Sequence, residues 1–227
     1  MNKRRQKIFI IIPAYNEESS IGKVVNDVAK HATKVIVVDD GSTDQTADNV
    51  KNRKAVVIKH MCNLGQGAAL QTGFDYAKYK NADVAVTFDA DGQQNPADIP
   101  KLIKKLNEMN ADVVLGSRFL GNTKNIPFTK YITLKIGILF TNILSNLNLT
   151  DTHNGFRVFT KAAIVKIEIK HNRMAHASEI IEEIRKNKLK YIEAPVNINY
   201  NKYSMQKGQS ISNSINILID LLFNKLN

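Results

Sequence analysis

The sequence predicts an α/β protein whose mostly parallel central sheet carries helices on both faces. Short apolar segments rich in β-branched residues alternate with segments whose apolar residues recur at helical spacing. Five of the apolar segments are followed directly by polar, turn-forming residues. In a parallel sheet those residues gather along one edge, beyond the carboxyl ends of the strands, where such sheets bind their ligands.

The first half of the chain supplies five expected strands. Continuous apolar runs with many β-branched residues suit strands that are buried on both faces of a sheet. Such runs occupy residues 8–12, 34–38, 55–58, 83–88 and 112–116. Helices are expected between them, at 21–28, in a short segment capped by Ser42 or Thr43, from about Gln66 onward, and around 99–106. This alternation of strand and helix predicts parallel neighbours with helices on both faces.

The second half of the chain has a different pattern. A long helix with a broad apolar stripe is expected at 129–149, a short strand at 154–159 and a helix at 176–187. The alternation of apolar and polar residues at 194–200 predicts an edge strand. A further apolar helix is expected at 211–226.

Composition narrows the range of functions. The chain has 227 residues, 43% of them hydrophobic, which suffices for one domain with a substantial core. The net charge of +11 favours an anionic partner, such as a phosphorylated substrate, nucleic acid or an acidic membrane surface. Nucleic acid is set aside because the chain lacks a stacking-aromatic motif and a recognition helix. A dinucleotide cofactor is set aside because G-x-G-x-x-G is missing.

Cysteine content and hydropathy predict a cytoplasmic protein. Cys62 is the only cysteine, so no disulfide can form within the chain, and a reducing compartment fits. We expect this thiol to be buried. The apolar run at 8–12 is too short for a signal peptide. No stretch approaches the roughly 20 apolar residues that a membrane-spanning helix requires.

The segment FDADGQQN (88–95) is the strongest sign of chemistry. Two carboxylates, Asp89 and Asp91, follow a buried strand with one residue between them. Because burial of an unpaired charge is costly, both are expected to face the edge of the sheet. Oxygen ligands in this arrangement suit Mg²⁺ or Mn²⁺, cations that also bind substrate phosphates. The alternative reading, a solvated turn, is disfavoured by the position of the pair at a strand end.

Six motifs occur in an order typical of one enzyme family: IIPAYNEE, VVDDGSTDQT, NLGQGAALQTGF, FDADGQQNP, GSRF and DTHNGFRVF. Together they resemble the family 2 glycosyltransferases, and most of all their dolichyl-phosphate mannose synthase and polyprenyl-phosphate glycosyltransferase branch. The resemblance implies a GT-A fold, a nucleoside-diphosphate sugar as donor, and Mg²⁺ or Mn²⁺ as cofactor. It also implies one domain over 1–227, with a nucleotide-sugar-binding half at 1–120 and an acceptor-side half at 121–227.

The resemblance assigns donor-side roles to particular residues. It implies a nucleotide-sugar pocket lined by Pro13, Tyr15, Glu17, Val38, Asp40, Asp89, Ala90, Asp91 and Arg118. Asp39 and Asp44 lie close to Asp40 in the sequence, and the motif does not rank the three acids. Asp89, Asp91 and Gln93 are the implied metal ligands. Arg118 is expected at the diphosphate or at an acceptor phosphate, because a guanidinium matches such oxygens.

The chemistry of the acceptor separates two hypotheses. A lipid phosphate is already an anion near neutral pH, so it needs cationic groups and no general base. The candidates for this role are Arg118, Arg157, Lys202, Lys207 and the hydroxyl of Ser210. Members of the branch often carry an arginine near Lys202, where this chain has lysines. A sugar hydroxyl would need a carboxylate base, for which Asp151 and Glu179 are the candidates. For both carboxylates a structural role, in a turn or on a helix face, is the alternative.

The sequence therefore predicts a metal-dependent inverting glycosyltransferase that acts on a lipid-phosphate or lipid-linked acceptor. Its apolar, lysine-flanked segments 129–149 and 211–226 indicate peripheral contact with the cytoplasmic membrane face, packing on the sheet, or a homodimer interface. The enzymatic alternative acts on a sugar hydroxyl in capsule, lipopolysaccharide or other cell-envelope polysaccharide synthesis. An alternative of another class is a non-catalytic nucleotide-binding module.

Overall fold

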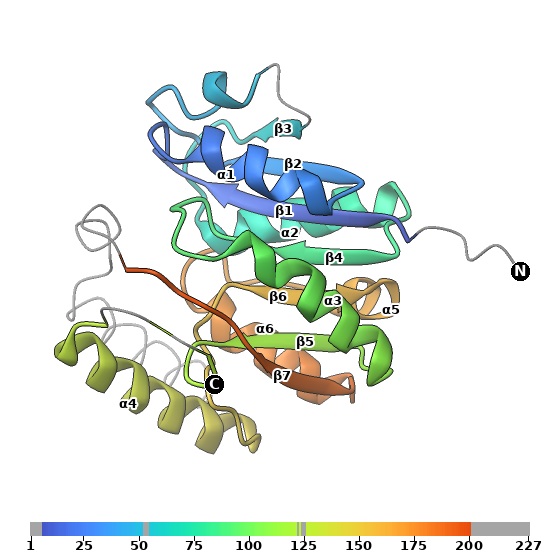
Figure 1. Ribbon diagram of the computed structural model, residues 1–227, viewed down its shortest axis with the longest axis vertical. Coiled ribbons are helices and arrows are strands. Elements are labelled where there is room, and N and C mark those ends of the chain that lie inside the picture. Colours follow the sequence, from blue (N-terminus) through green and yellow to red (C-terminus); the bar gives the residue numbers. More distant parts are fainter. Residues whose placement is uncertain (1–5, 52–54, 122, 124–125, 201–227) are drawn as a thin grey trace, which may run out of the picture.

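Seven strands form one sheet in a computed structural model that describes residues 6–51, 55–121, 123 and 126–200 (Figure 1). The strands are β1 (Ile8–Ala14), β2 (Lys34–Asp39), β3 (Ala55–Lys59), β4 (Val84–Thr87), β5 (Val113–Ser117), β6 (Arg157–Thr160) and β7 (Tyr191–Pro195). Their order across the sheet is β3-β2-β1-β4-β6-β5-β7. All pairings are parallel except those of β6, which runs antiparallel to β4 and β5. The predicted α/β class with a mostly parallel sheet is confirmed.

The reversed strand β6 brings a cation from late in the chain to the edge where the other strands end. Arg157 begins β6 and pairs with Thr87 of β4 and Leu115 of β5. These partners lie near the carboxyl ends of their own strands. Because β6 begins there, Arg157 joins the polar residues that follow β4 and β5.

Helices cover both faces of the sheet, as the sequence predicts. The helices of the first face are α1 (Ile21–Val28) and α3 (Ile99–Glu108), and those of the second are α2 (Gln66–Tyr79), α5 (Lys161–Lys166) and α6 (His176–Lys186). Side chains of a strand alternate between the faces. In β1, Ile10 and Ile12 therefore pack in the first core, and Phe9 and Ile11 pack in the second. Two apolar cores, one on each face, hold the sheet rigid.

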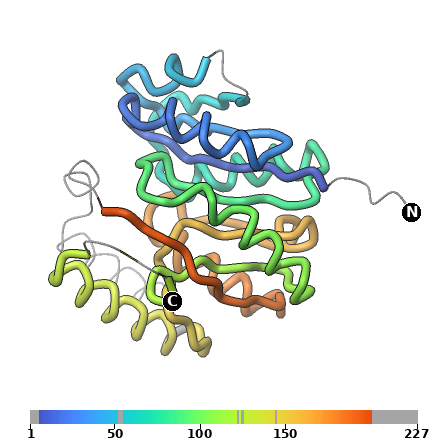
Figure 2. The backbone as a smooth tube through the Cα atoms, in the orientation of Figure 1, coloured from blue at the N-terminus to red at the C-terminus, as the bar shows by residue number. Residues whose placement is uncertain are grey.

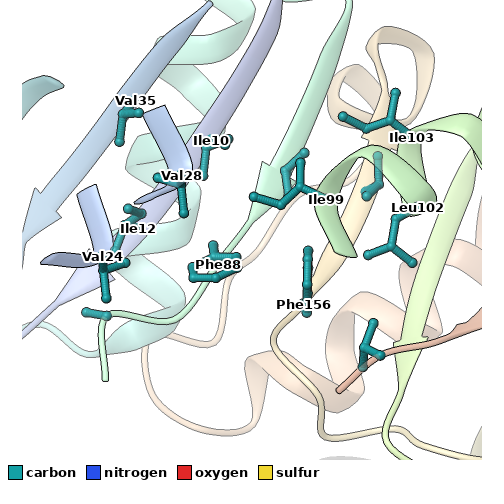
Figure 3. Close-up of a cluster of buried hydrophobic side chains, with 14 of the residues drawn as sticks. Ile10, Ile12, Val24, Val28, Val35, Phe88, Ile99, Leu102, Ile103 and Phe156 are labelled. Atoms are coloured by element: carbon teal, nitrogen blue, oxygen red, sulfur yellow. The ribbon is translucent and has the colours of Figure 1, made fainter. Parts of the chain in front are cut away.

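The first core fixes the two turns from which the candidate site is built. Phe88 and Phe156 meet edge to face with ring centroids 5.1 Å apart, beside Ile99 of α3 (Figure 3). Phe88 directly precedes the two aspartates, and Phe156 directly precedes Arg157. Aromatic packing thus anchors both segments where they leave the sheet.

Helix α4 (Phe128–Ser145) stands apart from the sheet and packs beside α6 (Figure 1). It ends before the predicted residue 149, because Asn146 adopts a left-handed conformation with φ 54°. The side chain of Asn142 also bonds the backbone N–H and C=O of Leu149, which folds the following residues back. Within the described ranges, the helices lack the length and apolarity needed to cross a membrane.

The predicted edge strand at 194–200 is wrong in its bounds. The strand at this edge of the sheet is β7, and residues 196–200 continue past it toward the loop after β4 (Figure 2). Val196, Ile198 and Tyr200 are buried, so the alternation does mark one buried side. However, the backbone bonds of this segment go to Ser117 O, to the Asp98 carboxylate and to Gln93 O, and Ile198 forms an isolated bridge with Gln94.

Other local predictions differ from the structure. The strand predicted at 154–159 begins only at Arg157, because the Asn154 side chain accepts the Phe156 N–H in a turn. The short helix after β2 is a 3-10 turn, Asp48–Val50, and Ser42 accepts the Asn16 N–H instead of capping it. Cys62 is exposed, not buried. The helix predicted at 211–226 lies outside the described residues.

Candidate active site

A cavity of about 1120 Å³ lies at the carboxyl edge of the sheet. Its walls come from the segments that follow β1, β2, β3, β4 and β5, from the start of β6, from α2, α4 and α6, and from the segment after β7. The volume exceeds the roughly 300–1,000 Å³ of a pocket for one drug-sized ligand, so there is room for two substrates.

Asp89 and Asp91 both line this cavity, and glutamine side chains hold both. Gln94 donates from Nε2 to Asp89 Oδ2 at 2.5 Å and accepts the Asp89 N–H at 3.0 Å. Gln93 donates to Asp91 from its backbone at 3.0 Å and from Nε2 at 2.6 Å. Gly92 between them has φ 72°, a conformation that favours glycine. The DADGQQ motif thus forms a self-supporting turn that presents two carboxylates to one space.

Gly155 leaves room for the Asp89 carboxylate. A Cβ at Gly155 would lie 2.5 Å from Asp89 Oδ1, which is closer than a carbon and an oxygen can approach. The Gly155 carbonyl also accepts the Thr87 hydroxyl at 2.6 Å. The NGF turn before β6 therefore seats the first aspartate directly.

The two aspartates carry unusual electrostatics. Burial, and next to it the neighbouring charge of Asp91, raise the pKa of Asp89 to about 7. Burial also raises the pKa of Asp91. A divalent cation would relieve both effects, and the paired carboxylates with the Gln93 amide are oxygen ligands of the kind that Mg²⁺ and Mn²⁺ take. Among the described residues there is no group of three or more His, Cys, Asp or Glu for a metal, so substrate phosphate and water would complete such a site.

Arg118 is a buried cation that several groups orient. Its Nε and backbone N–H donate to Asp151 Oδ2 at 2.6 and 3.0 Å, and Nη1 donates to the Tyr200 hydroxyl at 2.8 Å. Asp151 is itself held, because Glu193 of β7 accepts its N–H and that of Thr150. Arg118 lines the cavity, whereas Asp151 lies behind it.

Other basic side chains share this wall of the cavity. Arg157 is buried, and its Nη2 donates to the carbonyls of Thr152 and Ala177 at 3.0 and 3.4 Å. Burial lowers the pKa of Arg157 to about 10, which leaves it charged at neutral pH. Lys130, in the first turn of α4, lines the cavity too, and burial lowers its pKa.

Two histidines lie among these cations. Burial lowers the pKa of both His153 and His176 to about 4, so both rings are neutral at pH 7. His153 packs against α4 at Gly137, where a Cβ would lie 2.9 Å from His153 Cε1. The glycine therefore lets α4 approach the cavity closely.

The cavity lining also includes most of the predicted donor-side residues. Pro13, Tyr15, Glu17, Asp40 and Ala90 line the cavity, and the Tyr15 ring is 46% exposed.

Of the three neighbouring acids, Asp40 is the one that lines the cavity. Its carboxylate accepts the N–H groups of Leu64 and Gly65 at 3.0 and 2.7 Å and contacts His60 Nδ1 at 2.7 Å. Asp39 and Asp44 do not line the cavity. Asp40 therefore orders the NLGQG loop at the cavity rim.

Three predicted residues lie outside the cavity wall. Val38 is buried in the second core. Asp151 pairs with Arg118, and Glu179 accepts the N–H groups of Lys170 and His171, both at 2.9 Å. Neither Asp151 nor Glu179 lines the cavity. Lys202, Lys207 and Ser210 lie outside the described residues.

Sequence reasoning missed Lys130, His153, Gln94 and Tyr200. The signal for Lys130 is its place as a lysine in the first turn of an otherwise apolar helix. Gln94 belongs to the quoted motif, and only its contact with Asp89 reveals its role. His153 belongs to the quoted motif DTHNGFRVF, whereas no quoted motif includes Tyr200.

Comparison with known proteins agrees with this geometry. Residues 9–168 match the family described as Glycosyl transferase family 2. The chain is 37% identical over 242 residues to a UDP-N-acetylglucosamine–dolichyl-phosphate N-acetylglucosaminyltransferase of Methanococcus voltae, and the match covers 96% of each protein. It is 30% identical over 175 residues to the polyprenol monophosphomannose synthase of Mycolicibacterium smegmatis, covering 72% of this chain and 65% of that protein.

A solved structure shares the fold. The glucosyl-3-phosphoglycerate synthase of Mycobacterium tuberculosis, crystallised with Mn²⁺, UDP and glucosyl-3-phosphoglycerate, superposes with a TM-score of 0.75. The match covers 96% of this chain and 77% of that chain, at 14% identity, and confirms the predicted GT-A fold. With its family motifs gathered around one cavity, the chain is a glycosyltransferase that belongs to glycosyl transferase family 2.

Proposed function

We propose that this glycosyltransferase moves a sugar from a nucleoside-diphosphate sugar to the phosphate of a polyprenyl or dolichyl lipid. The observation that carries the proposal is the positive charge of one part of the cavity lining, which we call the acceptor wall. Arg118, Arg157 and Lys130 line it, and neither of the predicted bases, Asp151 and Glu179, does. Such a wall suits an acceptor that is already an anion and needs no proton removed.

On the donor side, the proposal places the nucleoside against the exposed ring of Tyr15 and the diphosphate near Asp89 and Asp91. A bound Mg²⁺ or Mn²⁺ would neutralise charge on the departing diphosphate. The carboxylates would hold that cation, and Gln94 and Gly155 keep Asp89 in place for it.

The proposed reaction is a single displacement with inversion. An oxygen of the lipid phosphate attacks the anomeric carbon and forms the new C–O bond. The bond between that carbon and the donor diphosphate breaks, and the nucleoside diphosphate leaves with the electron pair. Arg118 and Arg157 would orient the attacking phosphate and offset its repulsion from the donor.

Helix α4 supports a lipid acceptor at a membrane surface. Its Thr129, Lys130 and Gly137 side lines the cavity. Its outer side exposes a stripe of large apolar residues, Phe128, Ile132, Ile136, Leu139 and Ile143. We infer that this stripe lies in the interface of the cytoplasmic membrane face, so that a lipid phosphate passes along α4 into the cavity. The excess positive charge of the chain favours an anionic surface.

The similar proteins suggest the first substrates to test. The names of the relatives from Methanococcus voltae and Mycolicibacterium smegmatis describe transfer to dolichyl phosphate and synthesis of a polyprenol monophosphomannose. UDP-N-acetylglucosamine and nucleoside-diphosphate mannoses are therefore the first donors, and dolichyl phosphate is the first acceptor.

The decisive experiment compares acceptors that differ only in the phosphate. The protein is incubated with Mn²⁺, each radiolabelled donor, and either dolichyl phosphate or dolichol. Transfer to dolichyl phosphate and none to dolichol is the expected result, with loss of transfer in Asp91→Ala. Equal transfer to dolichol or to an oligosaccharide hydroxyl would instead favour the hydroxyl-acceptor enzyme. Nucleotide binding without turnover on any donor would favour the binding module.

A further inference from the structure

Tyr200 connects the cations of the acceptor wall to the loop that follows β4. It ends the segment 196–200, whose backbone is tied to the metal-loop residue Gln93 through the Asn199 N–H at 2.9 Å. Its ring lies under Lys130, with Nζ 4.6 Å from the ring centroid, and its hydroxyl accepts from Arg118 Nη1 at 2.8 Å. The side chain is buried and lines the cavity. Tyr200 thus contacts two of the three cations of the acceptor wall, Arg118 and Lys130, and adjoins the loop of the two aspartates.

The chemistry of the Arg118 contact fixes how the phenol is used. A guanidinium has only donors, so in this bond the tyrosine oxygen is the acceptor. The phenolic proton must therefore point elsewhere. Within the part of the chain that the structure describes, no residue accepts it. A buried hydroxyl usually donates its proton to some acceptor, and here the cavity is adjacent.

The surrounding charges keep this hydroxyl a donor. Burial raises the pKa of Tyr200 above its ordinary value, and the nearby Arg118 lowers it less strongly. The phenol therefore stays protonated at neutral pH. Two cations beside a free O–H attract an acceptor that is negatively charged, and a phosphoryl oxygen has that chemistry.

We propose that Tyr200 donates its hydroxyl proton to a phosphoryl oxygen of the substrate, beside Arg118 and Lys130. This proposal rests on the proposed function for its substrate class, but it concerns a residue outside every family motif quoted above. The phosphoryl oxygen belongs either to the lipid acceptor or to the donor diphosphate, and the two are separable by experiment.

The test uses a substitution that removes only the phenolic oxygen of Tyr200. Tyr200→Phe keeps the buried ring and its contact with Lys130. Tyr79→Phe is the matched control, because Tyr79 also lies under a lysine, with Lys80 Nζ 4.4 Å from its centroid, but is 74% exposed and outside the cavity. A lost hydrogen bond to a charged group lowers affinity by about tenfold or more. We expect Tyr200→Phe to raise the KM for dolichyl phosphate, or the Kd of UDP with Mn²⁺, by that factor, with kcat changed far less.

The two measurements, the KM for dolichyl phosphate and the Kd of UDP with Mn²⁺, form the two arms of the test. They identify which substrate supplies the phosphoryl oxygen, and they separate the proposal for Tyr200 from the proposed function. A change confined to KM for dolichyl phosphate assigns the contact to the acceptor, and a change confined to UDP binding assigns it to the donor. Calorimetry with UDP and Mn²⁺ requires no acceptor, so it tests Tyr200 even if transfer to lipid phosphate fails. If Tyr200→Phe behaves like Tyr79→Phe in both arms, the proposal is wrong.

A second replacement distinguishes direct contact from mere support of Arg118. 3-Fluorotyrosine at position 200 has a more acidic phenol, which is a better donor and a poorer acceptor. Direct donation to phosphate predicts tighter binding of the phosphate ligand, whereas support of Arg118 alone predicts weaker binding. Weaker binding would overturn the proposal.

Discussion

Asp151 is a buried side chain that holds a residue of the cavity lining without lining the cavity itself. Its carboxylate has no exposed surface and pairs with Arg118, which is 9% exposed. Buried ion pairs add little net stability, but removal of one partner strands the other charge. Asp151 thus fixes the direction in which Arg118 faces the cavity, and Glu193 fixes Asp151 in turn. This is the structural alternative to the general-base role considered for Asp151.

The positioning role predicts a particular pattern for Asp151→Asn. Loss of the charge should cost about 3 kcal/mol of stability because Arg118 remains buried without a counter-charge. The KM for the phosphate acceptor should rise by about tenfold or more as Arg118 loses its orientation. The shape of the pH–rate profile should stay as in the wild type. Steady-state kinetics across pH and a thermal melt measure all of these.

Glu179→Gln supplies the control for that variant. Glu179 also accepts two backbone N–H groups away from the cavity, so its loss should lower the melting temperature and leave KM unchanged. Disappearance of the acidic limb of the pH–rate profile in Asp151→Asn would mean that Asp151 is the base after all.

The structural elements show which features local patterns can predict. The five apolar runs of the first half became β1 to β5, because buried parallel strands leave a continuous β-branched signature. Strand β6 has only four residues, and its insertion between β4 and β5 depends on which distant segments pack together. Strand β7 was predicted too late in the chain, at 194–200, because its Glu193 and exposed Pro195 break the apolar pattern.

The same division applies to the candidate site. Asp89, Asp91 and Arg118 were predictable at the sheet edge, because they follow predicted strands, whereas Arg157 was a candidate only through its charge and was expected inside a strand. The partners of these residues were not predictable. Arg118 and Asp151 are 33 residues apart and Arg118 and Tyr200 are 82 apart, and no local pattern states that they meet.

Helix α4 carries a prediction of its own, about its outer stripe. Leu139 and Ile143 are 63% and 71% exposed, on the side away from the cavity. If the stripe enters a bilayer interface, Leu139→Glu with Ile143→Glu removes about 3–6 kcal/mol of apolar transfer. Binding to phosphatidylglycerol-containing vesicles should then fall by at least about 100-fold. Vesicle sedimentation measures this, together with transfer to dolichyl phosphate in the same vesicles.

Val165→Glu is the matched control for that double variant, because Val165 is 62% exposed on α5, away from the cavity. It should leave vesicle binding unchanged. Binding of UDP with Mn²⁺ should also survive in the α4 variant, since the donor side is not altered. If vesicle binding persists in the α4 variant, the stripe is not the membrane contact. Another surface would then bind the membrane, and the stripe would be free to contact a second copy of the chain.

The titration of the protein as a whole links metal binding to pH. Asp89 has a pKa raised to about 7 in the folded state, so between about pH 4 and 7 the folded protein binds a proton there that the unfolded chain has released. Its contribution to stability is therefore lost as pH rises through that window. His153 and His176 act in the opposite direction, because their folded pKa of about 4 lies below the ordinary 6.5. Their contribution is lost as pH falls from about 6.5 toward 4.

These contributions to stability oppose each other as pH changes. The informative quantity is therefore the difference in melting temperature with and without the metal. A divalent cation at Asp89 must displace the bound proton, so its apparent affinity should rise by about tenfold per pH unit below about pH 7 and level off above it. The increase in melting temperature on addition of Mn²⁺ should accordingly be small near about pH 5.5 and large near about pH 8. Asp89→Asn should remove this pH dependence, whereas Asp48→Asn, at an exposed carboxylate, should preserve it. A metal-induced shift that is the same at both pH values would place the cation away from Asp89, because only a site that competes with this proton couples the two.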